Sequence, residues 1–279
     1  MIRHMNTASH PRRARLTATL VLGVCACLLN PFSAIAEEGI VTDRPDVAES
    51  SAVVGRGHFQ IETSFVSERD KADGLKTTRQ STPTLLRLGV SESVELRVES
   101  DGFARARTQN SSTGATQRER GFSDASLGVK WHTQEGNEAQ GTPSMAWLLH
   151  ADLDSGSAGF RGQGLRPSLR FVAEWELPNE VSVGVMPGVM LDRNAQGGRF
   201  ASGILAVTVG KAWTPEWRGY VELAGLQLAS RRNGGSIVSF DAGVAWLVSP
   251  SMQLDASFSR GLNATAPDFQ WGIGLSVRY

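Results

Sequence analysis

The sequence predicts an all-β fold, an antiparallel transmembrane β-barrel of about twelve strands (about 10–14), preceded by a cleaved signal peptide. Three observations support this prediction: an export signal at the N-terminus, a period-two alternation of apolar and polar residues, and connections that are alternately short and long. The expected units are a signal peptide at 1–36, a charged N-terminal segment at 37–56 and the barrel at 57–279.

The first 36 residues have the organisation of a secretory signal. An apolar run at 16–29 follows a basic start and is shorter than the ~20 residues of a membrane-spanning helix. We expect cleavage after Ala36 and Sec-type export to the bacterial outer membrane. Both cysteines, Cys25 and Cys27, lie in the signal, so the mature chain has no disulfide. The basic residues are Arg3, Arg12, Arg13 and Arg15.

Composition narrows the function classes. Cleavage removes four of the 28 basic residues and none of the 28 acidic residues, which leaves a net charge of −4. This balance provides no basic face for nucleic acid. The histidines lack metal-ligand spacing, so neither a metal nor a cofactor is expected, and no catalytic constellation stands out. His150 with Asp152 and a serine leaves a surface lipid hydrolase as an alternative to a protein without enzymatic activity.

The alternation is clearest in the C-terminal strand, 270–279. Trp271, Ile273, Leu275 and Val277 alternate with small or polar residues, and the strand ends at Tyr279. Comparable strands are expected near 57–68, 94–99, 124–131, 168–177, 181–191, 238–248 and 252–259. The segments 79–90, 143–154, 200–213 and 217–229 fit less cleanly, and in the last two the apolar phase slips once, as at a β-bulge. We expect Tyr279 and its strand to be recognised by the barrel-insertion machinery.

The connections alternate in length. Tight turns are expected at 91–93, 178–179, 214–216 and 249–251, and longer polar loops at 70–74, 102–119, 155–164, 192–199, 231–235 and 261–268. The ten residues at 133–142 depart from this rule. Outer-membrane barrels have short periplasmic turns and longer extracellular loops, so both barrel ends should be periplasmic.

Five tryptophans fall at strand ends beside the short turns. An amphipathic ring favours the headgroup level of a membrane, so we interpret them as a periplasmic girdle in contact with outer-membrane lipid. The alternative is a soluble β-sandwich with ordinary core tryptophans. The five residues are Trp131, Trp175, Trp213, Trp217 and Trp246.

The polar phase of the strands carries the charges that should line the lumen. They either line a wet passage for a small solute or pair across the lumen and fill it. Twelve strands enclose more than a filled eight-strand barrel and less than an open porin, so we expect a narrow passage. The predicted lumen-lining residues are Glu62, Arg87, Glu95, Arg97, Glu99, Lys130, Arg170, Glu174, Glu222, Asp241, Asp255 and Arg278, with Asp152 in the same phase.

The alternation that predicts barrel strands does not account for the segment Thr42-Asp43-Arg44-Pro45-Asp46 with Glu49-Ser50. This segment precedes a Gly-His-Phe-Gln-Ile-Glu strand at 57–62. With Gly-Phe-Ser-Asp-Ala-Ser-Leu-Gly-Val-Lys at 121–130, it resembles the outer-membrane transporters grouped as the phenol-degradation meta-pathway family. The resemblance covers most of 40–279, and its first stretch is the specific part.

The resemblance implies an outer-membrane channel that passes or binds a small solute of aromatic or apolar character. On this basis Asp43, Arg44, Asp46 and Glu49 either enter the lumen as a plug or gate, or cap the periplasmic rim. The competing function is a structural or adhesive outer-membrane barrel with a filled lumen.

Overall fold

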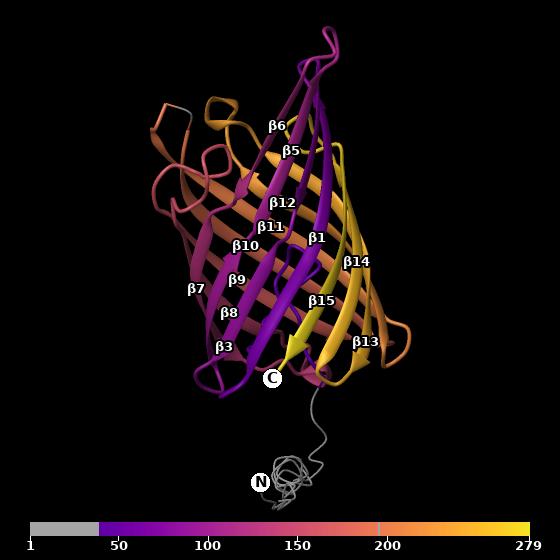
Figure 1. Cartoon of the computed structure of the whole chain (residues 1–279). Helices are drawn as coiled ribbons and strands as arrows, with labels where there is room; N and C mark the ends of the chain where they lie inside the picture. The colour runs from indigo at the N-terminus through magenta and orange to yellow at the C-terminus, as the bar shows by residue number, and fades with distance from the viewer. Residues whose placement is uncertain (1–38, 195) are drawn as a thin grey trace, which may run out of the picture. The chain divides into compact units, whose positions relative to one another are not determined.

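The structure, a computed structural model, describes residues 39–194 and 196–279, so the predicted signal peptide lies outside the described residues. The described chain forms one antiparallel sheet that closes into a barrel (Figure 1). Its strands are β1 (Phe59–Ala72), β2 (Leu75–Ser81), β3 (Thr84–Gly89), β4 (Val94–Ser100), β5 (Phe103–Asn110), β6 (Thr116–Phe122), β7 (Ala125–Gln134), β8 (Ser144–Asp152), β9 (Arg166–Leu177), β10 (Val181–Arg193), β11 (Arg199–Ala212), β12 (Trp217–Leu228), β13 (Ile237–Ser249), β14 (Met252–Gly261) and β15 (Phe269–Arg278).

The barrel closes between β1 and β15, where ten residue pairs run from Gln60–Arg278 to Arg69–Phe269. Three of its strands are interrupted, because β2 continues into β3, β4 into β5, and β6 into β7. The fifteen strand segments therefore make twelve barrel strands, which confirms the predicted count. Full closure leaves no unpaired edge in the hydrocarbon layer.

One interruption follows from close packing at Gly102, between β4 and β5. Gly102 has a φ of 67°, and a Cβ there would lie 2.3 Å from the carbonyl oxygen of Thr82. Only glycine meets both conditions without strain. The facing interruption between β2 and β3 contains Pro83, whose carbonyl accepts a hydrogen bond from the backbone N–H of Ser64 at 2.9 Å. Both strands therefore bend at the same level.

The expected phase slips are bulges. The β11–β12 register shifts between Gly203 and Leu205, and the β12–β13 register shifts between Gly225 and Gln227. An extra residue on one strand reverses which side chains point outward beyond it, which explains the broken alternation at 200–229.

The prediction of long loops at 70–74 and 102–119 is wrong. β1 and β2 are joined only by Asp73 and Gly74, both with positive φ, and most of 102–119 belongs to β5 and β6. We call residues 66–72, 75–81, 103–110 and 116–122 the projecting sheet, since they extend past the other strands at one end (Figure 1). Charged residues replace apolar ones on the outward face of this sheet, so its strands lack the apolar alternation by which strands were recognised.

The outward surface is apolar, and aromatic rings lie at its turn end. Four of the five predicted tryptophans are at least 39 % exposed there, and Trp217 stacks on Trp246 with 5.5 Å between ring centroids. The link at 135–143 contains a short 3-10 helix, η2 (Glu138–Gln140), and a second, η3 (Arg231–Asn233), lies between β12 and β13. Within 39–194 and 196–279, no helix has the length and apolar character needed to span a membrane.

Candidate functional site: a lumen segment and its two walls

The residues ahead of β1 lie inside the barrel. We call residues 40–54 the lumen segment; in Figure 1 it is the indigo trace visible between the front strands. It enters beside the β13–β14 turn, where the backbone N–H of Ile40 donates to the carbonyl of Pro250 at 2.7 Å. Most of its side chains are buried, including Thr42, Asp43 and Ser51.

Carboxylates from four strands accept hydrogen bonds from the segment's backbone. Glu62 on β1 accepts the N–H groups of Asp43 and Arg44 at 3.0 and 3.1 Å. Glu222 on β12 accepts those of Val47 and Ala48 at 2.8 and 2.7 Å. The other two contacts are Ser51 N–H to Glu174 at 2.5 Å and Val54 N–H to Glu95 at 2.9 Å. A segment without secondary structure thus has its buried donors satisfied by the wall.

Wall cations bind the carbonyl groups of the same segment. Arg87 on β3 donates to the carbonyls of Val41 and Ala52 at 3.0 and 2.8 Å. Lys130 on β7 donates to the carbonyl of Ser50 at 2.7 Å. The wall therefore recognises donors and acceptors of the backbone, in addition to the segment's charged side chains.

Asp43 is the central charged side chain of the segment. Its carboxylate lies 2.5 Å from Nη1 of Arg97, 2.7 Å from Nζ of Lys130 and 3.4 Å from Nη1 of Arg87. Burial acts to raise the pKa of Asp43, but the positive charges of Arg87, Lys130 and Arg97 outweigh it and hold that pKa well below its usual range. Asp43 is therefore ionised and fully paired.

Glu49 forms the second ionic contact of the segment. Its carboxylate lies 2.5 Å from Nη2 of Arg97 and 2.7 Å from Nη1 of Arg170 on β9. Burial raises the pKa of Glu49, whereas Arg97 and Arg170 lower it, and the result is a pKa of about 2. Arg97 thus bridges Asp43 and Glu49.

The other two predicted plug residues have weaker contacts. Arg44 lies 3.4 Å from Glu99, in a pair whose side chains are 20 % and 34 % exposed. Asp46 lines a cavity on the turn side, where burial and the nearby Glu222 carboxylate raise its pKa well above the usual range. A gating role for Asp43, Arg44, Asp46 and Glu49 stays a prediction.

The predicted lumen-lining residues fall into two groups. Nine contact the lumen segment, and they are Glu62, Arg87, Glu95, Arg97, Glu99, Lys130, Arg170, Glu174 and Glu222. Asp241 accepts a hydrogen bond from Ser239 instead, and the Asp255 carboxylate lies against Gly274. Arg278 lies opposite Gln60 in the barrel-closing pair, on the same face as that buried side chain.

Several residues that were not predicted from the sequence also hold the segment. Gln60 donates to the carbonyl of Val41 at 2.9 Å, and Gln253 and Arg218 donate to Oγ1 of Thr42 at 2.9 and 3.0 Å. His132 Nδ1 lies 3.0 Å from the carbonyl oxygen of Ser51. Gln60 lies two residues before Glu62 in β1, and His132 lies two residues after Lys130 in β7. Because alternate residues of a strand face the same side, both side chains could have been predicted to point into the lumen.

The opposite wall carries an apolar patch that the sequence reasoning missed. Leu148, Val172, Met186 and Ile204 point inward from β8 to β11 and are at most 5 % exposed. They pack with Ala48 of the lumen segment, and Val47 and Met190 contact the same cluster. We call this the apolar wall, and the cluster of Glu62, Arg87, Glu95, Arg97 and Lys130 on β1, β3, β4 and β7 the ionic wall.

A cavity of about 610 Å³ lies between the lumen segment and strands β9 to β13. The charged residues of its lining are mainly acidic, with Asp46, Glu49, Glu174, Glu176 and Glu180 against Lys211 and Arg218. Residues from the turn end, including 135–138, complete it. We call it the vestibule, and it leads from the turn end towards the lumen segment.

The residues of the hydrolase alternative are not linked. Both ring nitrogens of His150 lack a hydrogen-bond partner within the described part of the chain, and Asp152 lies 3.8 Å from Arg166. His150 instead packs against Gly128 on the neighbouring strand.

A family model described as "Putative MetA-pathway of phenol degradation" matches residues 42–279. Among solved structures, an outer-membrane channel from Pseudomonas putida F1 is similar with a TM-score of 0.60 and 13 % identity, covering 85 % of this chain and 99 % of that one. The KdgM porin (TM-score 0.47, 11 % identity, 78 % and 98 % covered) and the CymD monoaromatic hydrocarbon channel (TM-score 0.39, 11 % identity, 80 % and 88 % covered) are more distant. The search of curated proteins found no match.

The match to the family model confirms the resemblance seen in residues 42–62 and 121–130. A closed antiparallel barrel with an apolar outer surface is the architecture of a bacterial outer-membrane protein, as predicted. The alternative of a soluble sandwich is therefore wrong.

Proposed function

This chain belongs to the phenol-degradation MetA-pathway family, and we propose that it is an outer-membrane channel for a small apolar or aromatic solute, held closed by the lumen segment. The observation that carries the proposal is the unequal lumen. Strands β1, β3, β4 and β7 bind the segment through buried ionic and hydrogen-bonded contacts, whereas β8 to β11 offer it an apolar surface beside Arg170 and Glu174.

The two walls have different tasks in this proposal. The ionic wall determines where the segment docks, because each buried charge there requires its partner. The apolar wall contacts small apolar side chains of the segment, Val47 and Ala48. When the segment moves away, Leu148, Val172 and Met186 become the lining of a passage that favours apolar solutes.

The vestibule restricts the solute further. Its acidic residues outnumber its basic ones, so an anion would be repelled on the turn side. A neutral or cationic small molecule fits both the vestibule and the apolar wall. Neutral phenol-like compounds meet these conditions.

Planar-bilayer recordings test the proposal. In D43N/E49Q the segment loses both carboxylates that face Arg97, so we expect a pore that is open for a larger fraction of the time than in the wild-type protein. Phenol added to this open pore should block its current at lower concentration than glycerol does. D241N is the matched control, since Asp241 points inward without binding the segment.

If neither protein conducts more than the bare bilayer, and liposomes with either protein swell no faster than protein-free liposomes, the channel proposal is wrong. The barrel would then be a structural or adhesive one with a permanently filled lumen. Equal block by phenol and glycerol would retain the channel and reject its apolar preference.

A further inference from the structure

The outward face of the projecting sheet is basic. Cross-strand register places Arg105 opposite Arg120, and Arg107 opposite Arg118. On its other side Arg105 pairs with Gln80, which pairs with Ser67, and Arg107 pairs with Thr78, which pairs with Arg69. Lys71 pairs with Lys76. Directly paired residues of an antiparallel sheet point to the same face. This face therefore carries seven cations: Arg69, Lys71, Lys76, Arg105, Arg107, Arg118 and Arg120.

The acidic residues of the projecting sheet are on its other face. Glu68 pairs with Arg79, which pairs with Ala106, which in turn pairs with Glu119. Asp70 follows in the same phase as Glu68. The three acidic residues in these strands therefore share one face, and seven of the eight basic residues occupy the opposite one. A sheet that needed only solubility would not require this separation.

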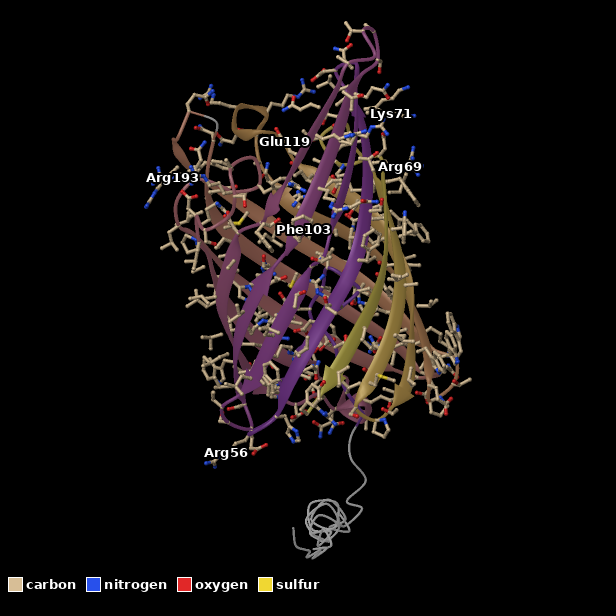
Figure 2. The ribbon with its side chains drawn as sticks, viewed as in Figure 1. Arg56, Arg69, Lys71, Phe103, Glu119 and Arg193 are labelled. Atoms are coloured by element: carbon tan, nitrogen blue, oxygen red, sulfur yellow. The ribbon has the colours of Figure 1, made fainter. Side chains whose placement is uncertain are left out.

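The basic face continues the lipid-facing surface of the barrel. At its base, Phe103 packs edge-to-face on Phe122 with 5.4 Å between ring centroids, and Phe65 packs on Trp271 at 5.7 Å. The Phe122 side chain is 62 % exposed. The other face is covered by the β8–β9 loop, because Arg79 lies over the Phe160 ring. Figure 2 shows Arg69 and Lys71 beyond the level of Phe103, at the end of the barrel opposite Arg56.

These cations have no anionic partner in the part of the chain that the structure describes. Within residues 39–194 and 196–279, none of the seven side chains forms an ion pair or a side-chain hydrogen bond. The Arg105 guanidinium contacts only a ring, 5.3 Å from the Phe103 centroid. A hollow of about 580 Å³ is lined by Thr78, Gln80 and the four arginines of β5 and β6, with Ala106 and Glu119. Four uncompensated guanidinium groups around a hollow are a site for an anion.

The position of the face identifies the anion. An aromatic belt lies at the membrane interface, and Arg105 and Arg107 follow Phe103 by two and four residues, or ~7 and ~13 Å along the strand. These cations thus stand at the level of the headgroups in the outer leaflet. We infer that the outward face of the projecting sheet binds the phosphate groups of the outer-leaflet glycolipid, with Arg105, Arg107, Arg118 and Arg120 as the principal ligands. Arginine suits this task because its fork of donors matches phosphate geometry.

Native mass spectrometry of the mature protein in a nonionic detergent tests this inference. The probes are bisphosphorylated lipid A and the same lipid without its phosphates. We expect R105Q/R107Q/R118Q/R120Q to bind the bisphosphorylated lipid about tenfold or more weakly than the wild-type protein does, and to bind the dephosphorylated lipid equally. The control R161Q/R199Q/R231Q/R232Q removes four exposed arginines elsewhere in the chain and should keep wild-type affinity for both.

Heat-modifiable electrophoretic mobility would verify that each variant is folded, and R107Q/R118Q replaces the quadruple variant if it is not. Equal affinity of wild-type protein for both lipids would overturn the inference, because the acyl chains alone would then explain binding. So would an equal loss in the control variant, or wild-type protein that binds a soluble anionic polysaccharide more tightly than the phosphorylated lipid. Conductance of the quadruple variant reports separately on the proposed channel.

Discussion

The ionic wall and the apolar wall face the same fifteen-residue segment, but they bind it by different kinds of contact. On the ionic wall, Asp43 and Glu49 meet Arg97, Lys130 and Arg87 in side-chain pairs that are at most 8 % exposed. On the apolar wall, Ala48 meets a patch of aliphatic side chains and Met186. The ionic contacts specify one docked position, whereas the apolar contacts are tolerant of sliding. This difference suits a segment that must dock accurately and also release.

The expected energies of the two kinds of contact also support this difference between the walls. A buried ion pair is a poor source of net stability, because desolvation offsets most of the attraction, but loss of one partner is costly. The ionic wall is therefore a switch-like contact, which is stable while complete and weak once a partner is neutralised. Burial of a few aliphatic side chains contributes a smaller, graded stabilisation.

The largest effect is expected from Arg97→Met, which removes the bridge between Asp43 and Glu49 and leaves their charges buried. Such a loss costs about 3–5 kcal/mol, roughly a factor of 100 or more in the docking equilibrium. Hydrogen exchange should show that loss of protection at the segment's bonded amides, while β10 and β11 stay protected. Unchanged protection would mean that the ionic wall does not hold the segment, and D241N serves as the control.

The second prediction concerns the apolar wall. In the D43N/E49Q background, Met186→Ser should weaken current block by phenol about tenfold or more, because it removes roughly 1.5–3 kcal/mol of apolar contact. Hydrogen exchange of the lumen segment should be the same in D43N/E49Q with and without Met186→Ser. If segment protection falls while block by phenol is retained, the assignment of tasks to the two walls is reversed.

Acid should weaken the ionic wall alone. Glu49 has a docked pKa of about 2 against an ordinary value of 4.5, and the pKa of Asp43 is also lowered. A lowered pKa contributes stability that is complete above the ordinary value and is lost as pH falls through the docked value. Conductance of the wild-type channel should thus rise as pH falls from about 4.5 towards 2. E49Q should show a smaller rise, and a profile identical to that of the wild-type protein would contradict this role for Glu49.

The smallest effect is expected from Arg44→Ala. Its pair with Glu99 is partly exposed, and such pairs contribute about 1 kcal/mol or less. Segment protection in hydrogen exchange should fall no more than about fivefold, with nearly unchanged conductance. A loss as large as that of Arg97→Met would show that the segment is held at its rim rather than in the lumen.

Much of the fold was predictable because the membrane imposes a simple pattern. Lipid-facing side chains must be apolar at every second position, so alternation at 181–191, 238–248 and 270–279 revealed strands, and its slips at 200–229 revealed bulges. The prediction failed at 70–74 and 102–119, where charged residues take the outward positions of the strands and the apolar pattern disappears.

The closed barrel of twelve strands, the family and the set of inward-facing charges were all predictable from the sequence alone. The folded structure was needed to show which of those charges meet the lumen segment, and that Leu148, Val172, Met186 and Ile204 form an apolar wall. The reason is physical: alternation specifies which face a side chain occupies, whereas the partner across a lumen depends on strand register and on the path of a segment without periodicity. The predicted twelve-strand barrel thus encloses a docked segment held between two chemically different walls.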